Sequence, residues 1–578
     1  MRFGKRVRPD AIVIAICLIA NTLLLGWGAS RHSPNWDEIG HLPAGLSHLE
    51  LGSFELYAVN PPLVRTVAAL PVSFVPHKTS WQISGNKPGQ RNEFTVGIRF
   101  LEANQFRSFW LFALARWACI PFSWLGAWGC YLWARDLYGR RAGVVAVAIW
   151  SFSPSVLAYG QMITPAIGAT AFGCIANYAF WRWLKHPSWK AATITGVAFG
   201  LTLLTKTTWL ILFGLWPLVW CCWRWKLFKA TDRLERPVLI EIAQLLAILG
   251  LGIYLVNFGY LFDGSLRPLG EYEFVSETLS EITADEDHAK WGSNRFRGTW
   301  LASVPVPFPQ KFVEGIDLQK RDFEMKMWSY LRGEWRRGGW WYYYLYAMLV
   351  KMPIGTHMLI AFGLLALLFM RTNHLEDELV LLAPTVLVLI LVSSQTGFNH
   401  HLRYVFPAFP GLYVLASKAF SSHMSRSVHR VAVTALVAMI CSSVFVWPHS
   451  RSYFNEAIGG PINGHNHLGG SFMDTNVDCG QDLLFLREWI DAQPKNSKIY
   501  VLFNGAVSPK IAGVDKLVES ASRIESVHSN SWESGQYAIS VNLLHDRQGR
   551  LDYFRNQPVR ERIGYSINVY CFRSFTNH

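Results

Sequence analysis

Charged residues are scarce in this chain. Asp, Glu, Lys and Arg make up 16% of its 578 residues, whereas hydrophobic residues make up 51% and aromatic residues 14%. Soluble globular proteins carry about 25% charged residues, and the mean hydropathy of this chain is positive. The shortage of charge therefore indicates a protein whose main solvent is lipid.

Nucleotide-binding glycine motifs, internal repeats and low-complexity tracts are also missing from the sequence. An enzyme that uses sugar nucleotides would need such a glycine motif on its cytoplasmic side, so this class of enzyme is not expected. None of the nine cysteines stands in a metal-ligand spacing, and no zinc site is implied. Cys479 and Cys571 lie in the polar tail and could pair in an oxidising compartment, which the sequence leaves open.

The basic residues orient the chain. Four Lys and Arg residues in Met1–Arg8 precede the apolar run Ala11–Trp27, which we interpret as a retained first helix with a cytoplasmic amino terminus. The formal net charge is +14, which would also suit a nucleic-acid binder. The cationic residues cluster, however, in short loops between apolar runs, as in membrane proteins. We therefore expect a multi-pass protein of the plasma (inner) membrane, in contact with membrane lipids and not with nucleic acid.

Further apolar runs, each long enough or nearly long enough to cross a bilayer, follow along the chain. With the first run they predict a polytopic α-helical membrane protein with about eleven transmembrane helices. If this count holds, the loops rich in Lys and Arg are those on the cytoplasmic side of the membrane. An odd number of spans places the carboxyl-terminal segment outside. The runs are 109–134, 142–160, 164–183, 190–205, 207–223, 238–262, 343–370, 378–396, 404–420 and 428–447.

Two long loops and a polar tail set the expected domain organisation. Residues 1–447 form the transmembrane domain, with outer loops at 31–106 and 263–342, the first of which is expected to hold half-buried interfacial helices. Residues 448–578 form a small extracytoplasmic α/β domain. Its expected elements are strands at 497–503 and 536–544 and a helix at 481–493.

Two adjacent carboxylates, Asp37 and Glu38, open the first outer loop, and His41 follows them in the stretch Asn35–Ala44. Neighbouring acids in a partly desolvated setting can have pKa values that differ, which suits one of them to act as a general base. An acidic loop that caps a helix is the alternative interpretation. The residues themselves do not decide between the two.

Four cations stand where a membrane protein has few, toward the outer ends of helices: Arg65, Lys206, Lys351 and Arg403. By the expected topology they share a face with Asp37 and Glu38. Ionisable residues at membrane depth cost a few kcal/mol each and usually mark function. Such a cluster fits an anionic, phosphate-bearing ligand. The alternative is that each cation merely reaches interfacial water.

In chain order, five short motifs resemble the GT-C integral-membrane glycosyltransferases, most closely the dolichyl-phosphate-mannose protein mannosyltransferase and aminoarabinose transferase branch. The tail motifs 453–461 and 474–482 resemble a bacterial subgroup of that branch. The five motifs are Asp37-Glu38, Asn60-Pro-Pro-Leu63, Thr205-Lys206, Lys351-Met-Pro353 and Arg403-Tyr404.

This resemblance implies an inverting glycosyltransferase that moves a sugar from a polyprenyl-phosphate donor to an acceptor hydroxyl of a protein, lipid or glycan at the outer membrane face. Asp37 then corresponds to the catalytic base, with Glu38 beside it, and Lys206 and Arg403 to donor phosphate ligands. The remaining candidates are Arg65 and Lys351 for the phosphate and His41, Asn60 and Tyr404 for the pocket.

The chain departs from the family pattern at three places. Many relatives have Lys where this chain has Asn60, and Cys479 replaces a Trp of the tail motif. Many relatives also have an Asp in the short outer loop after the third apolar run, where this chain reads Ile163-Thr-Pro-Ala166. No acid is then available for a metal-binding pair, so we expect metal-independent chemistry without a cofactor.

Two other functions stay open. A transporter or flippase of an anionic lipid-linked substrate would use the outer cations as one end of a path, and it would need ionisable residues through the bilayer midplane. Few are found, and no two halves of the chain resemble each other. A catalytically idle relative that binds lipid in the same groove is the third possibility. The sugar and the acceptor are not revealed by the sequence.

Overall fold

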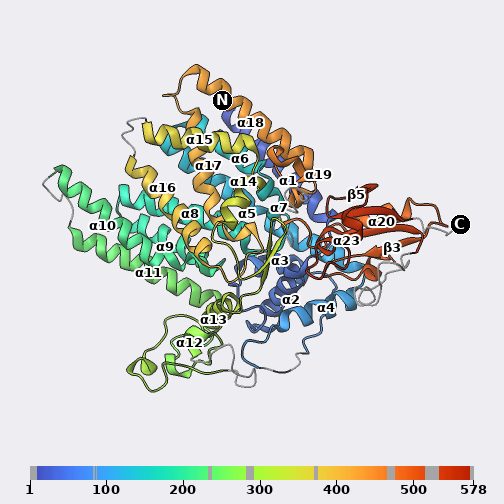
Figure 1. The fold of residues 1–578 in the computed structure, drawn as a ribbon. Coiled ribbons are helices and arrows are strands. Elements are labelled where there is room, and N and C mark those ends of the chain that lie inside the picture. Colours follow the sequence, from blue (N-terminus) through green and yellow to red (C-terminus); the bar gives the residue numbers. More distant parts are fainter. Residues whose placement is uncertain are drawn as a thin grey trace, which may run out of the picture.

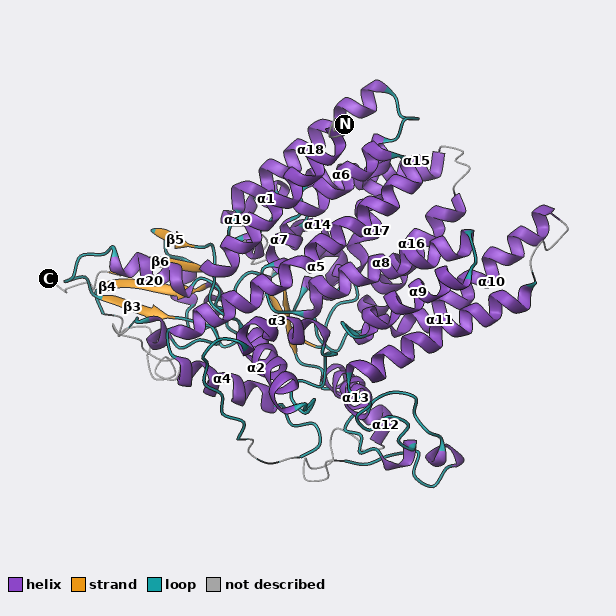
Figure 2. Cartoon of the chain, turned by 180° about the vertical axis from the view of Figure 1, so that it is seen from behind, coloured by secondary structure: helices purple, strands orange, loops and turns teal. Residues whose placement is uncertain are grey.

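The computed structural model describes residues 9–82, 85, 87–231, 237–280, 292–369, 375–464, 476–514 and 533–572. Long helices run side by side through most of the molecule, and a small sheet lies at one end beside the carboxyl terminus (Figure 1). The same division is visible from behind, where all the labelled strands at that end belong to the tail (Figure 2). The expected fold class, an α-helical membrane protein with a small carboxyl-terminal α/β region, is confirmed.

The helical part is built from apolar segments that match most of the predicted runs. Its helices are α1 (Pro9–Arg31), α5 (Arg107–Tyr138), α6 (Arg140–Ser151), α7 (Pro154–Gly160), α8 (Pro165–Lys185), α9 (Trp189–Leu203), η1 (Thr207–Ile211), α10 (Leu212–Thr231), α11 (Val238–Gly259), α14 (Tyr343–Lys351), α15 (Ile354–Phe369), α16 (Leu375–Ser394), η4 (Leu402–Tyr404), η5 (Phe406–Ala408), α17 (Phe409–Ser417), η6 (Lys418–Phe420) and α18 (Arg426–Val446).

Within the described residues, four helices are long and apolar enough to cross a membrane, namely α1, α5, α11 and α18. The number rises to six if two bent pairs each count as one span. The predicted count of about eleven therefore stays a prediction.

The bends lie at proline. α6 and α7 meet at an angle of 56°, before Pro154, and α14 and α15 meet at 115°, before Pro353. Proline lacks the N–H that continues a helix, and it disfavours helical backbone in the residue before it. The run 343–370, expected as one span, is therefore two helices with a sharp turn between them. Lys351 ends the first of these.

The first outer loop folds into α2 (Trp36–Leu51), α3 (Leu63–Ser73) and α4 (Asn92–Asn104). Helices were expected here, but half-buried ones. α2 is instead buried from Glu38 to His48, because α3 and α4 pack against it. Asn35 caps α2: its side chain accepts hydrogen bonds from the N–H groups of Asp37 and Glu38, and the Glu38 side chain returns to the Asn35 backbone.

The second outer loop holds η2 (Leu269–Glu271), α12 (Glu277–Ser280), η3 (Trp300–Ser303), α13 (Gln310–Glu324) and the hairpin of β1 (Trp328–Leu331) with β2 (Glu334–Arg337). α13 lies directly on the segment that joins α2 to α3. A Cβ atom on Gly315 would lie 2.0 Å from the carbonyl oxygen of Ala58. Only glycine permits this approach, which brings the two outer loops together.

The tail carries a four-stranded sheet in the order β3-β4-β6-β5, in which β3 and β4 are parallel and the other pairs are antiparallel. The predicted strand at 497–503 corresponds to β3, and the predicted helix at 481–493 corresponds to α20. The predicted strand at 536–544 is correct only as far as Ser540, in β4, because its last four residues form the short helix α22. Cys479 and Cys571 are both free, so they do not pair. The tail elements are η7 (Ser450–Ser452), η8 (Glu456–Ile458), α19 (Gly460–Asn463), α20 (Leu483–Asp491), β3 (Ile499–Leu502), η11 (Pro509–Ala512), β4 (Gly535–Ser540), α22 (Val541–Leu544), α23 (Asp552–Arg555), β5 (Glu561–Ile563) and β6 (Ile567–Phe572).

Candidate active site

Asp37 meets Arg403 across 366 positions of sequence. The Arg403 Nη1 atom donates to Asp37 Oδ2 at 2.6 Å, and the Tyr57 hydroxyl lies 3.5 Å from Asp37 Oδ1. The two charged side chains are not sealed, since 22% of the Asp37 side chain and 11% of the Arg403 side chain are exposed. A reactant can therefore reach this carboxylate.

The charge state of Asp37 follows from its neighbours. Burial by itself would raise the pKa of this carboxyl, but the Arg403 guanidinium outweighs burial and holds the pKa below its ordinary range. His41 stacks on the ring of Tyr57 with ring centres 4.0 Å apart. Burial, reinforced by Arg65, lowers the pKa of His41 to about 3. At neutral pH the site therefore holds an ionised Asp37 next to an uncharged imidazole.

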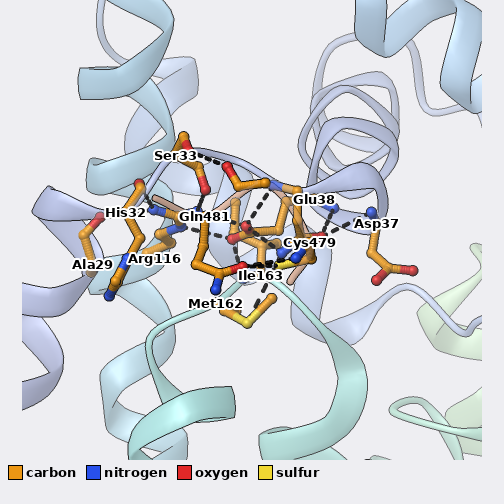
Figure 3. Close-up of polar contacts among 12 residues, drawn as sticks. Ala29, His32, Ser33, Asp37, Glu38, Arg116, Met162, Ile163, Cys479 and Gln481 are labelled. Atoms are coloured by element: carbon orange, nitrogen blue, oxygen red, sulfur yellow. Dashed lines mark hydrogen bonds and ion pairs between the residues drawn. The ribbon is translucent and has the colours of Figure 1, made fainter. Parts of the chain in front are cut away.

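Glu38, the next residue, points to the opposite side of the helix start. Its carboxylate accepts two hydrogen bonds from Arg116, of 2.7 Å from Nε and 2.6 Å from Nη2. The Ile163 N–H and the Asn35 side chain donate to it as well, at 2.9 and 2.8 Å. Both charged side chains are almost completely buried. Figure 3 shows Glu38 inside this network and the Asp37 carboxylate turned away from it.

Lys206 lies in the turn between α9 and η1. Its Nζ atom is 5.2 Å from the centre of the Tyr404 ring, and the Arg403 guanidinium carbon is 5.9 Å from the centre of the same ring. Burial, together with the charge of Arg403, lowers the pKa of Lys206 to about 7. Among the residues that the structure describes, the ammonium group forms no hydrogen bond or ion pair. Two cations thus flank Tyr404, and one of them lacks a protein partner there.

A cavity of about 310 Å³ opens at Lys206 and Tyr404. Polar residues from α13, Gln319 and Lys320 among them, line one part of it. Apolar side chains line another part, and these are Leu210, Ile211, Leu391 and Val392. Asp37, Glu38 and Arg403 are not among the lining residues, although Arg403 adjoins Tyr404 in the chain. The cavity therefore combines a cationic end with an apolar wall.

The other two predicted cations are held by the fold. Lys351 donates to the carbonyl oxygens of Arg451 at 2.8 Å and of Asn476 at 2.6 Å. Arg65 donates to His48 Nε2 at 2.7 Å and to the Tyr57 carbonyl oxygen at 2.8 Å. Both side chains are buried. The hydrogen bonds of Lys351 and Arg65 connect separate segments of the chain. The Lys206 ammonium group makes no such bonds to the residues that the structure describes.

The remaining pocket candidate, Asn60, ends a turn in which its N–H donates to the Tyr57 carbonyl at 3.4 Å. Tyr57 itself has a positive φ of 62°, an uncommon conformation for a bulky residue. This places Tyr57 between Asp37 and Arg65. The Asn-Pro-Pro motif therefore follows a strained turn that borders the site.

Sequence reasoning missed three residues that shape the site: Tyr57, Arg116 and Asn476. Arg116 gave a signal, because an arginine inside an apolar run needs a buried partner. Asn476 was part of a quoted tail motif, but its contacts could not be foreseen. Its side chain accepts from the Leu402 N–H at 2.9 Å and donates to the His400 carbonyl at 2.7 Å. The tail thus fixes the loop that carries Arg403.

Comparisons with known proteins agree with the resemblance seen in the motifs. The sequence profile of the family described as dolichyl-phosphate-mannose-protein mannosyltransferase matches residues 108–251, from α5 to α11. That segment contains Lys206 and Arg116 but not Asp37 or Arg403. No curated protein sequence is significantly similar to the chain.

Solved structures give a distant likeness. ArnT from Cupriavidus metallidurans in the apo state is 13% identical, with 97% of each chain covered and a TM-score of 0.44. The same protein bound to undecaprenyl phosphate is 12% identical, with 97% of each chain covered and a TM-score of 0.42. Both scores are below 0.5, so neither structure bears on the function of this chain. What the profile match confirms is that this membrane protein resembles the dolichyl-phosphate-mannose-protein mannosyltransferase family.

Proposed function

We propose that this protein is an inverting glycosyltransferase that moves a sugar from a polyprenyl-phosphate donor to an acceptor hydroxyl at the outer face of the plasma (inner) membrane. The observation that carries the proposal is the reachable, ionised Asp37 paired with Arg403 beside the unpartnered ammonium of Lys206. The family match over residues 108–251 supports the same class of donor.

Asp37 is the catalytic base in this proposal, and Glu38 is not. A general base must reach the proton that it removes, and part of the Asp37 side chain is exposed. The Glu38 carboxylate is buried and already accepts hydrogen bonds from Arg116, Ile163 and Asn35. A retaining mechanism needs a second reachable carboxylate as nucleophile. One free carboxylate therefore favours inversion.

The reaction step needs only charges that the protein supplies. The acceptor oxygen attacks the anomeric carbon from the side opposite the phosphate, and its proton passes to Asp37. The bond from the anomeric carbon to the phosphate oxygen breaks, and its electron pair leaves with the polyprenyl phosphate. Arg403 and Lys206 stabilise the negative charge of that leaving group. A guanidinium carries five donors, so Arg403 can bind phosphate while Nη1 stays on Asp37.

The isoprenoid tail of the donor would follow the apolar wall of the cavity at Lys206. Leu210 and Ile211 come from η1. Leu391 and Val392 come from α16, a helix made mostly of apolar residues. Apolar side chains at a cationic end match a lipid phosphate, in which the head is charged and the chain is not. We assign donor binding to Lys206 and Arg403, and we no longer assign it to Lys351 or Arg65.

Metal-independent catalysis is part of the proposal. At Ile163–Ala166, where many relatives carry an acid, this chain contributes the Ile163 N–H to Glu38. That segment therefore helps to hold Glu38. With Arg403 and Lys206 at the phosphate, protein cations take the place that a divalent ion would have there.

The test compares lipid-linked sugars and glycans, by mass spectrometry, from cells that lack this chain and cells that express it. We expect a sugar-bearing product with the wild-type chain that is missing with Asp37→Asn. Asp491→Asn, at an exposed position of α20, is the matched control and should keep the product. The same product with Asp37→Asn at the wild-type amount would overturn the assignment of the base.

A further inference from the structure

Two histidines and an aspartate meet where the tail joins the helical part. His32 directly follows α1, His449 lies just after α18, and Asp482 precedes α20. Each offers one ligand atom, and these atoms all lie within 4.8 Å of one another. The separations from Asp482 Oδ1 are 3.4 Å to His32 Nδ1 and 3.0 Å to His449 Nδ1. We propose that this cluster is a binding site for a divalent transition-metal ion, with Zn²⁺ the ion best suited to its donors.

The distances fit a metal ion. Zn²⁺ binds imidazole nitrogen and carboxylate oxygen at about 2.0–2.1 Å in a tetrahedron, so neighbouring ligand atoms lie about 3.3 Å apart. The two separations from Asp482 Oδ1, 3.4 and 3.0 Å, are close to that value. The third separation, between the two imidazole nitrogens, is at most 4.8 Å, so the two rings would have to move closer together if it is longer than about 3.3 Å. Two imidazoles and one carboxylate are also a donor set that zinc takes in proteins, with water at the fourth position.

The hydrogen bonds of His32 leave one nitrogen for a ligand. His32 Nε2 is 3.1 Å from the carbonyl oxygen of Pro448, to which it can only donate. In the neutral imidazole, Nδ1 then carries the lone pair. That atom is buried and makes no hydrogen bond, although a carboxylate oxygen faces it. Two electron-rich atoms facing each other in a buried place call for a cation between them, and a second ring nitrogen bonded to a carbonyl is the usual arrangement of a metal-bound histidine.

The surroundings of Asp482 complete the site. Its side chain is fully buried, and its second oxygen, Oδ2, accepts from the Ser566 hydroxyl at 2.6 Å. Oδ1 faces the two imidazoles and forms a hydrogen bond of 3.0 Å with His449 Nδ1. The carboxylate orientation is therefore fixed, and a metal ion would take the place of the proton between these two atoms. The Phe485 ring covers both imidazoles, with ring centres 5.5 Å from His32 and 4.8 Å from His449. The His449 side chain is 15% exposed, which gives an ion a way in.

A metal ion here would tie the tail to the candidate active site. The residue after His32, Ser33, donates its N–H to the Gln481 carbonyl at 2.9 Å. Arg116 donates to the His32 carbonyl at 2.6 Å and also holds Glu38, the neighbour of Asp37. The ion would therefore act as a clamp that positions the start of α2, and it would take no part in the transfer step. This inference does not depend on the proposed function.

Residue spacing does not indicate this site, because 417 positions separate His32 from His449 and the ligands come from three segments. The earlier expectation of no metal concerned cysteine spacing and the catalytic step. A structural ion between imidazoles and a carboxylate is compatible with metal-independent transfer.

The test uses the full-length protein, purified in detergent and stripped of metal. Titration with Co²⁺ should give the visible absorption bands of a low-coordinate Co²⁺ ion that saturate at one ion per chain, and Zn²⁺ should displace them. Elemental analysis after equilibration with Zn²⁺ should give the same stoichiometry. Asp482→Asn should weaken Zn²⁺ binding by at least about 100-fold, whereas Asp491→Asn, at the other end of α20, should not.

Because Asp482→Asn alters a buried site and can impair folding, His449→Gln at the partly exposed ligand serves as the second variant, with His429→Gln on α18 as its control. Failure of the wild-type protein to bind either Co²⁺ or Zn²⁺ would overturn the proposal and leave a protonated His–Asp–His cluster. Equal stoichiometry in the wild-type protein, Asp482→Asn and His449→Gln would also overturn it, because the ion would then lie elsewhere.

Discussion

Asp37 and Glu38 are neighbours in the chain, and each forms an ion pair with an arginine, but the two pairs differ in what surrounds them. Asp37 and Arg403 keep 22% and 11% of their side chains exposed, whereas Glu38 and Arg116 keep 0% and 2%. Glu38 also accepts from a backbone N–H and from Asn35. A substrate can therefore reach the charged groups of Asp37 and Arg403. It cannot reach those of Glu38 and Arg116.

The difference assigns separate tasks to residues that look equivalent in sequence. A sealed ion pair contributes little net stability compared with an apolar pair, but the loss of one member leaves an unpaired buried charge. The open pair is partly exposed, so water can reach either charge after the other is removed and the loss of stability should be smaller. We therefore expect variants of Glu38 to affect folding and variants around Asp37 to affect transfer.

The largest expected effect on stability is that of Glu38→Gln. The Arg116 guanidinium would lose its counter-charge inside the protein, which costs about 3–5 kcal/mol, so the thermal unfolding temperature in detergent should fall sharply. Asp37→Asn is the matched variant and should cost less, because both side chains of that pair are partly exposed to water. If both substitutions lowered the unfolding temperature by the same amount, the distinction between the two pairs would be wrong.

Arg403→Gln should weaken donor binding by about 1.5–3 kcal/mol, the value of a hydrogen bond to a charged group. It should also move the acid limb of the pH–rate profile upward. Arg403 holds the pKa of Asp37 below its ordinary value against the effect of burial, so burial prevails once the guanidinium is gone. Transfer rates measured from about pH 4 to 8 would show the shift. Arg487→Gln, at a partly exposed position of α20, should leave the limb in place, and an unmoved limb in Arg403→Gln would contradict this pairing.

Lys206→Arg keeps the positive charge at this position but removes its titration near neutral pH. Burial lowers the pKa of Lys206 to about 7, so the charged form is present below that pH and is lost as the pH rises. The kcat/KM of the wild-type protein should therefore decline above about pH 7. Arginine stays protonated throughout, and the decline should disappear. Lys320→Arg, in the same cavity, should keep it; a decline that persists in Lys206→Arg would show that another group titrates.

Tyr57→Phe is the mildest change at the open pair. The hydroxyl lies 3.5 Å from Asp37 Oδ1, a long hydrogen bond, while the stacking on His41 is kept by phenylalanine. We expect a loss of about 0.5–1.5 kcal/mol in kcat/KM, measured by initial rates. Tyr260→Phe is the control, because the Tyr260 hydroxyl is buried without a hydrogen bond. A loss of several orders of magnitude in Tyr57→Phe would assign a larger role to that hydroxyl.

Much of the fold was predictable, because long apolar runs and alternating apolar residues depend on the local secondary structure and its burial. β3, β4 and α20 lie where the patterns placed them, except that the second strand ends at Ser540 and not at Leu544, and the apolar runs form helices. The bends at Pro154 and Pro353 were not predicted as bends, although proline signals them. The burial of α2 was missed because it depends on α3 and α4, and no pattern within α2 reports its neighbours.

For the candidate site, the sequence identified the unusual charged residues but did not show which residues they contact. Asp37, Lys206 and Arg403 were selected as unusual charges near a membrane surface, and the structure brings Asp37 and Arg403 into contact and both cations to Tyr404. Lys351 was selected by the same reasoning, yet it binds two carbonyl groups. Partners far apart in sequence decide whether such a charge is held by the fold or left for a ligand.

The central claim is most directly tested by donor binding and sugar transfer, measured side by side on the wild-type protein and Asp37→Asn reconstituted in lipid vesicles. We predict that Asp37→Asn binds polyprenyl phosphate within a few-fold of the wild-type affinity but transfers sugar about 10²–10⁴-fold more slowly. Transfer at the wild-type rate by Asp37→Asn would contradict the role of Asp37 as the base.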